Sequence, residues 1–370
     1  MKKFSVLLLL FVCCNHKTPL GIETDTDFIH YNVAKWYQNH PSAITLTYDI
    51  GLGTAEHPYT KAMINQAITE VRNRNLRMDF EMVTGYYYQN EERSPWLDTI
   101  RTILIPNGIH FFGHGHWHIN HDEVSYSEAF ESFQLCMTLM KEWDLNPKVY
   151  AYPESAGLEK ETQQANHDAG FIAARGSTYN REEYYICAND EEEPKNWYYL
   201  PSVPIASNER SDYVRTHEEV VEIIDKSLNN NSWIILMYHG VGLPNLWGYY
   251  PFDEYISDLD YIVDKDFWKG NFDDVTIYIQ ERNAFSINYS KISQSEKESK
   301  YSITFQDGLD NTIYNHPLTV ELVFNEETKV KEVCFSPAID LCEVYQAVEN
   351  TITMDVIPDE RTYTMEIHFN

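Results

Sequence analysis

Positive charge is scarce in this sequence. The chain has 28 lysines and arginines against 57 aspartates and glutamates, which gives a formal net charge of −29. A surface with this balance repels the phosphate backbone of nucleic acids over most of its area. We therefore expect no nucleic-acid partner.

Cysteine is also sparse, with six residues in a chain of 370. Cys13 and Cys14 are adjacent near the N-terminus, and the other four are scattered without any CxxC spacing. Four scattered cysteines in a chain of this length do not make a disulfide framework. The sequence thus excludes a disulfide-rich scaffold and a metal site built on paired cysteines.

Long apolar runs are missing, apart from a short one at residues 4–12. This run follows Lys2 and Lys3, is too short to cross a bilayer as a mature helix, and ends at Cys13 and Cys14. The layout predicts a signal peptide over residues 1–14, of the lipoprotein type in which one cysteine becomes the lipidated first residue. We therefore expect an exported protein, either a cell-envelope lipoprotein with a lipid anchor or a secreted protein.

After this segment, apolar strand-like stretches alternate with helix-like segments over residues 28–292. Residues 43–48 and 233–238 are short, apolar and rich in β-branched side chains, which is typical of buried strands. Residues 125–143 form an amphipathic helical pattern that begins with Ser125 and Glu128, spaced as in a capping box. Such alternation indicates parallel pairing, in a (β/α) barrel or a doubly wound sheet.

The C-terminal part has a different pattern. A polar stretch between residues 292 and 301 predicts a solvated linker. Residues 300–370 then contain several short strand-like segments separated by turn residues, with no helical periodicity. This pattern predicts a small β-sandwich domain, which could cap the barrel or bind carbohydrate.

Polar residues with catalytic potential follow four of the predicted strands. They are Asp49, the histidines between 114 and 121, the segment 152–154 and His239. Sites in parallel α/β folds lie at the carboxyl ends of the strands, so these groups are expected to meet in one cleft. The sequence therefore favours an enzyme-type site.

Four histidines stand within eight positions, at 114, 116, 118 and 121. In a first helical turn, His114 and His118 would project from one face and could share a cation at about 2.0–2.1 Å from each nitrogen. His121 would lie about 10 Å further along a regular helix, at about 1.5 Å per residue. The pair His114 and His118 is thus the predicted metal end of the cleft.

The motifs resemble, in the same order, those of the polysaccharide deacetylases with the NodB homology domain, carbohydrate esterase family 4. Residues 47–51, Thr-Tyr-Asp-Ile-Gly, stand where the family has Thr-Phe-Asp-Asp-Gly. Residues 114–118 fit its His-Ser/Thr-x-x-His pattern, with Gly115 where serine or threonine is usual. The Tyr-Pro element within residues 151–157 matches the third motif, and the His-Gly at 239–240 matches the last. Trp197 stands where an Asp-x-x-Asp-Trp element is often found.

This resemblance implies a (β/α) barrel of the polysaccharide-deacetylase type that removes N- or O-acetyl groups from a polysaccharide or oligosaccharide. Asp49 would be the general base and His239 the general acid. His114 and His118 would bind zinc or another divalent metal. The residues expected to support the substrate are Tyr152, Pro153, Glu154 and Trp197.

The first motif departs from the family at Ile50, which stands where the third metal ligand, an aspartate, is expected. A two-histidine site binds zinc more weakly than a three-ligand site. The substitutes that the sequence offers are Asp49 itself, His57, His116 and Asp122. If Asp49 is the ligand, Glu154 could supply the base. The alternative function is a carbohydrate-binding, deacetylase-like protein that has lost catalysis through Ile50.

Overall fold

The computed structural model describes residues 28–49, 67–86, 94–245, 247–339 and 342–370. The chain divides into two compact units. The barrel unit consists of Lys35–Asn283 and Thr312–His316, and the β unit takes in Met1–Ala34, Ala284–Asn311 and Pro317–Asn370.

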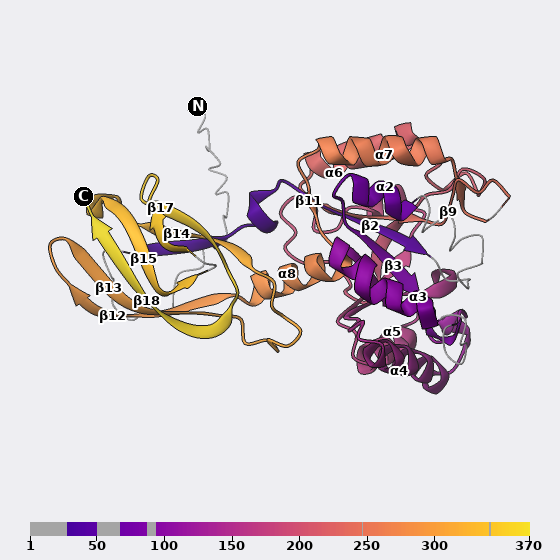
Figure 1. Cartoon of the computed structure of the whole chain (residues 1–370), viewed down its shortest axis with the longest axis horizontal. Helices are drawn as coiled ribbons and strands as arrows, with labels where there is room; N and C mark the ends of the chain where they lie inside the picture. Colours follow the sequence, from indigo (N-terminus) through magenta and orange to yellow (C-terminus); the bar gives the residue numbers. More distant parts are fainter. Residues whose placement is uncertain (1–27, 50–66, 87–93, 246, 340–341) are drawn as a thin grey trace, which may run out of the picture. The chain divides into compact units, whose positions relative to one another are not determined.

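The centre of the barrel unit is a closed parallel barrel (Figure 1). Seven strands pair in chain order from β2 to β8, and β8 pairs back onto β2 through six residue pairs from Ala43 to Tyr48. The strands are β2 Ala43–Asp49, β3 Met78–Met82, β4 Ile109–Gly113, β5 Val149–Ala151, β6 Ala173–Ser177, β7 Leu200–Pro204 and β8 Trp233–Tyr238. The short strand β11 (Trp268–Lys269) pairs with β2 as well, and β9 (Gly240–Val241) pairs with β10 (Tyr249–Tyr250). The barrel alternative predicted from the sequence is therefore confirmed.

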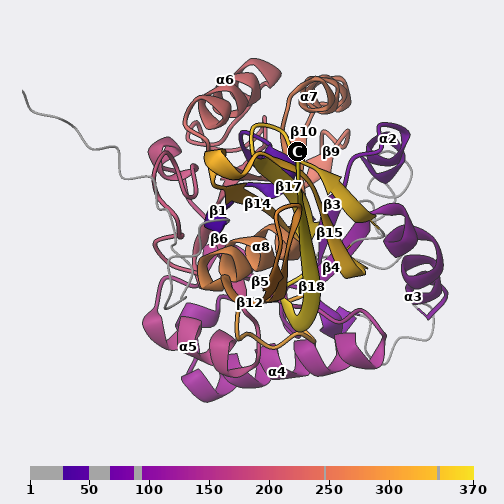
Figure 2. The same cartoon turned by 90° about the vertical axis from the view of Figure 1, so that its left-hand side faces the viewer.

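Helices surround this barrel, and Figure 2 shows α2 to α7 as a ring with α8 labelled inside it. They are α2 Ile68–Asn73, α3 Ser94–Thr99, α4 Tyr126–Glu142, α5 Lys160–Asp168, α6 His217–Asn229, α7 Phe252–Asp264 and α8 Phe272–Ala284. Helix α4 begins with the expected capping box, in which Ser125 and Glu128 each bind the other's backbone N–H. Among the helices that the structure describes, none is both long and apolar enough to cross a membrane.

The two faces of the barrel strands have different chemistry. In β2, Ile44, Leu46 and Tyr48 belong to the apolar core that includes residues of the surrounding helices. The alternate residues Thr45 and Thr47 are equally buried but polar. Because side chains alternate between the faces of a strand, this second set points into the barrel. The inward face of β2 is therefore polar, whereas the inward residues of β8, Trp233, Ile235 and Met237, are apolar.

The β unit contains two antiparallel sheets. One has the order β1-β14-β17 and the other the order β12-β13-β18-β15-β16. The strands are β1 Phe28–Val33, β12 Ser286–Gln294, β13 Glu298–Gln306, β14 Leu318–Phe324, β15 Val330–Ile339, β16 Cys342–Gln346, β17 Thr351–Val356 and β18 Asp359–Phe369. Burial alternates along β13, and Tyr31 of the first sheet packs edge-on against Phe285, which directly precedes the second. Each sheet thus buries one face in a shared core.

The unit boundaries differ from the sequence expectation in two places. The polar stretch after residue 292 was expected to be a linker, but it forms the turn of a hairpin in which β12 pairs with β13. Strand β1 pairs with β14, which places the first described residues in the β unit and not in the barrel. The polar residues of this stretch indicated solvent exposure. They could not distinguish a linker from an exposed hairpin, because both are polar.

A partly buried histidine lies at the amino-terminal end of the barrel, opposite the predicted site. His110 is the second residue of β4, and its ring lies between Asp79 (3.3 Å from Nδ1) and Asp273 (3.4 Å from Nε2). Asp79 also accepts hydrogen bonds from the Asn271 side chain and the Phe272 backbone N–H, which connects β3 to the start of α8. Burial alone would lower the pKa of His110, but the two carboxylates raise it to about 9.

This arrangement predicts a pH-dependent stability. The pKa of His110 is raised in the fold from 6.5 to about 9. The stability that protonated His110 adds to the fold is therefore complete below about pH 6.5 and is lost as the pH rises through about 9. We expect His110→Gln to lower the free energy of unfolding by about 3 kcal/mol near pH 6 and by little near pH 9. Urea unfolding at both pH values checks this, and an equal loss at both would contradict it.

Candidate functional site

A cavity of about 390 Å³ opens at the carboxyl end of the barrel. The lining residues stand in the carboxyl-terminal halves of β2, β6 and β8 or in the segments that follow β4, β5, β6, β7 and β8. The lining side chains are Asp49, His114, His118, Tyr152, Glu154, Ser155, Arg175, Ser177, Tyr179, Tyr213, Met237, His239 and Trp247. The four polar groups that the sequence placed at strand ends therefore all contribute to one cavity.

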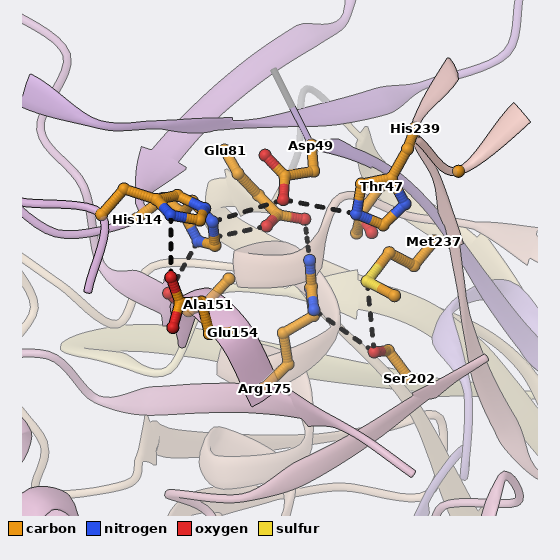
Figure 3. A network of polar contacts seen from close by, with 12 residues as sticks. Thr47, Asp49, Glu81, His114, Ala151, Glu154, Arg175, Ser202, Met237 and His239 are labelled. Atoms are coloured by element: carbon orange, nitrogen blue, oxygen red, sulfur yellow. Dashed lines mark hydrogen bonds and ion pairs between the residues drawn. The ribbon is translucent and has the colours of Figure 1, made fainter. Parts of the chain in front are cut away.

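Asp49, the last residue of β2, lies between two histidines (Figure 3). Its Oδ2 is 3.3 Å from Nε2 of His114 and 3.4 Å from Nε2 of His239. Burial alone would raise the pKa of Asp49, but the two histidines hold it well below its ordinary value. The carboxylate is thus ionised at neutral pH and can accept protons, hydrogen bonds or a metal ion.

His114 directly follows β4 and is almost fully buried. Its Nδ1 lies 3.0 Å from the carbonyl oxygen of Ala151. A carbonyl can only accept, so Nδ1 carries a proton. Burial alone would lower the pKa of His114, but the Asp49 carboxylate beside Nε2 raises it. In the part of the chain that the structure describes, this Nε2 has no hydrogen-bond partner, and it faces Asp49. Such an orientation is typical of a metal-ligating histidine.

His118 reaches the same point through a loop and not through the expected helical turn. Residues 114–120 have no helical assignment, and Gly115 has a φ of +87°, which excludes a continuous right-handed helix. The loop nevertheless brings the two imidazole rings to a centroid distance of 5.1 Å. Burial lowers the pKa of His118, which keeps the ring neutral and able to bind a metal.

His239 directly follows β8. Its Nε2 faces the Asp49 carboxylate at 3.4 Å, and its ring packs edge-on against Trp247 at a centroid distance of 4.4 Å. The Asp49 carboxylate thus holds a nitrogen of His239 toward the same space that His114 faces. A proton on that nitrogen would be available to a group bound in the cavity.

The residues at this point fit a divalent metal ion. Asp49, His114 and His118 can each offer one ligand atom, and the three atoms all lie within 4.8 Å of one another. Two imidazole nitrogens and a carboxylate oxygen are a donor set that zinc accepts. The unpartnered Nε2 of His114 supports this fit, since a buried polar atom normally has a partner.

Of the substitute ligands that the sequence offered, Asp49 lies at this point, but His116 and Asp122 do not. His116 is paired through Nδ1 with the hydroxyl of Thr84 at 3.1 Å. Asp122 accepts hydrogen bonds from three successive backbone N–H groups, those of residues 157–159. Neither residue lines the cavity. His57 and Ile50 lie outside the described residues.

The expected substrate-supporting residues divide into two groups. Tyr152 and Glu154 line the cavity, and Pro153 is buried between them. Glu154 lies 3.8 Å from Nδ1 of His118 and is half exposed. Trp197 is not among the lining residues; its carbonyl binds the N–H of Ala174, near the start of β6. Trp197 precedes β7, so it lies toward the amino-terminal end of the barrel, away from the site.

Sequence reasoning missed several residues that line the cavity or lie beneath it. Arg175 and Glu81 are buried in the barrel interior and form an ion pair with each other. Tyr179, Tyr213 and Trp247 add aromatic walls. For the first two a signal was present, because a charged residue inside a strand that is otherwise fully buried needs a partner. The three aromatics come from irregular loops, where the sequence gives no periodicity to interpret.

Two other groups of potential ligands already have their charge compensated. In the first, the His110 ring lies between Asp79 and Asp273 and presents a different nitrogen to each. In the second, Glu298, Glu366 and His368, the ammonium of Lys300 lies 2.8 Å from Glu366 and 3.5 Å from Glu298. Of these groups, the cluster at Asp49 is the one that faces a cavity.

Comparisons with known proteins give fold likenesses only. No family model matches the chain, and no curated protein matches it. Among solved structures, a family 4 carbohydrate esterase from Streptomyces lividans is similar at 11% identity and a TM-score of 0.39, over 62% of this chain and 91% of that one. A family 4 pseudoenzyme from Bacillus anthracis is similar at 9% identity and a TM-score of 0.40, over 65% and 68%.

A carbohydrate deacetylase covers more of this chain, 88%, and 65% of its own length, at 10% identity and a TM-score of 0.45. At such identities and TM-scores a likeness says nothing about activity. These likenesses concern the fold of those proteins and of this chain alone.

Proposed function

We propose that this protein is a metal-dependent hydrolase that removes acetyl groups, bound to nitrogen or oxygen, from a glycan. The observation that carries the proposal is the convergence of Asp49, His114 and His118, whose ligand atoms lie within 4.8 Å of one another. His239 and Glu154 line the same cavity and offer a proton donor and a proton acceptor. These are the parts that hydrolysis of an acetyl amide or ester needs.

His114, His118 and Asp49 are the residues that would hold the metal. A bound divalent ion would polarise the acetyl carbonyl and lower the pKa of a bound water. The motif resemblance gives Asp49 the role of base. Its approach to Nε2 of His114 favours a ligand role instead, which also supplies the donor that the sequence lacks at Ile50.

With Asp49 as a ligand, the base passes to Glu154. Its carboxylate lies beside His118 and is half exposed, so a water molecule can reach it. Glu154 would accept the proton of the attacking water. His239 would donate a proton to the leaving nitrogen or oxygen, and the Asp49 carboxylate would hold its Nε2 in place.

The aromatic walls favour a sugar as the substrate. Tyr179 and Tyr213 lie side by side with their hydroxyls 3.3 Å apart, and Trp247 is half exposed. Such rings offer apolar faces to sugar rings and polar edges to hydroxyl groups. The net charge of −29 favours a neutral glycan over an anionic one. We also propose that the protein is exported. This part rests on the sequence alone, because residues 1–14 lie outside the described residues.

We expect the purified protein to bind one divalent ion and to release acetate from acetylated chito-oligosaccharides or acetylated xylan. Chelation should lower this release more than tenfold, and added zinc should restore it. Acetate release that survives complete chelation would contradict the mechanism. Glycan binding without acetate release, with or without metal, would favour the carbohydrate-binding alternative.

A further inference from the structure

Beneath His114, a buried network of polar contacts crosses the barrel interior (Figure 3). Oε1 of Glu81, on β3, forms an ion pair with Nη2 of Arg175, on β6. Nη1 of Arg175 donates to the hydroxyl of Ser202, on β7, at 3.3 Å, and this hydroxyl donates to the carbonyl of Gly176. Glu81 and Arg175 are at most 1% exposed. These polar contacts thus connect the strands β3, β6 and β7 at one level of the barrel.

A buried ion pair of this kind is not explained by stability. Removing two charges from water costs several kcal/mol per ion, and apolar residues of similar volume often stabilise a core as well or better. The interior of a barrel can be filled by apolar side chains. The location of the pair, directly below the cavity, therefore indicates a role in the site.

The second oxygen of Glu81 provides the connection to the site. Oε2 lies 3.3 Å from Nδ1 of His114, the nitrogen that also approaches the carbonyl of Ala151 at 3.0 Å. One N–H thus faces two acceptors, of which one is a full negative charge. A carboxylate on the far nitrogen of a ligating histidine fixes the ring and increases the donor strength of the near nitrogen.

We propose that Glu81 is a positioning residue that aims Nε2 of His114 at the metal position, and that Arg175 fixes Glu81 in turn. The inference rests on the metal site of the proposed function. Glu81 itself does not line the cavity and would not touch the substrate. Its effect is therefore on metal affinity and not on substrate contacts.

The direct test is Glu81→Gln. The amide has one acceptor and one donor end, so it cannot accept from both Arg175 and His114 at once. Either Arg175 or the Nδ1–H of His114 then faces another donor. We expect the zinc affinity, measured by calorimetric titration well below the unfolding temperature, to fall about 10- to 100-fold.

A second substitution separates positioning from damage to the fold. In the double variant Glu81→Gln with Arg175→Met, the amide oxygen is released from Arg175 and can accept from His114. We expect the double variant to bind zinc more tightly than Glu81→Gln alone. If the double variant loses as much zinc affinity as Glu81→Gln alone, or more, the proposal is overturned.

His110→Gln is the matched control, because it breaks a buried charged cluster at the opposite end of the same barrel. It should lower stability without changing zinc affinity more than about twofold. If Glu81→Gln binds zinc as tightly as the wild type does, the Ala151 carbonyl alone orients His114 and the proposal is wrong. If the wild type binds no zinc, the proposed metal site itself fails, which is a different result.

Discussion

Replacement of Asp49 by asparagine should weaken zinc binding at least 100-fold, or about 3 kcal/mol, and abolish acetate release. The substitution removes the negative charge and leaves a neutral amide, a weaker ligand, in place of the carboxylate among the three groups that lie within 4.8 Å of one another. It also replaces one of the carboxylate oxygens with an NH2 group, which cannot accept from His114 or His239. Zinc titration of the purified variant, combined with an acetate assay, measures both effects.

Glu154→Gln is the matched control, since it makes the same chemical change in the same cavity. We expect this variant to keep its zinc affinity and to release acetate about 10²- to 10⁴-fold more slowly, because the proton acceptor is lost. If instead Asp49→Asn keeps zinc and Glu154→Gln keeps activity, Asp49 is the base, as the motif resemblance implies, and another residue completes the metal site.

Replacement of His239 by glutamine should slow acetate release from an N-acetylated chito-oligosaccharide by about 10²- to 10⁴-fold. Glutamine can hold a hydrogen bond to Asp49, but it cannot deliver a proton to the leaving amine. An aryl acetate ester has a leaving group that needs no proton, so its hydrolysis should fall less than about tenfold. Initial rates on the two substrates give the comparison.

The control for this variant is His121→Gln. His121 lies in the loop that follows the metal histidines, but its Nε2 is paired with Ser132 at 3.0 Å and burial lowers its pKa to about 3. It should behave like the wild type on both substrates. Equal losses on the amide and the aryl ester in His239→Gln would contradict the acid role and would point to a role in holding Asp49.

The barrel could be predicted because each buried strand is a short apolar run and the runs alternate with helical patterns. The same reasoning placed Asp49, His114, Glu154 and His239 together, since parallel strands end at one face. It does not extend to residues whose position depends on the chain path between strands. Trp197 was predicted to support the substrate, but it precedes a strand and does not line the cavity.

The path from His114 to His118 could not be predicted from spacing alone. An i, i+4 pair fits a helical turn, but Gly115 takes a left-handed conformation and the segment is a loop. The same two side chains are close together in either path, so the functional inference does not depend on the helix. The role of Glu81 could not be predicted for another reason: its partner Arg175 lies on β6, which does not pair with β3, and only the curvature of the barrel brings the two side chains together.

The most direct test of the metal site is an anomalous difference map at the zinc absorption edge, from crystals of the protein grown with zinc. The account predicts a peak at about 2.0–2.2 Å from Nε2 of His114, a nitrogen of His118 and an oxygen of Asp49. A map with no peak there, or with zinc bound only at Asp79, His110 and Asp273, would contradict it.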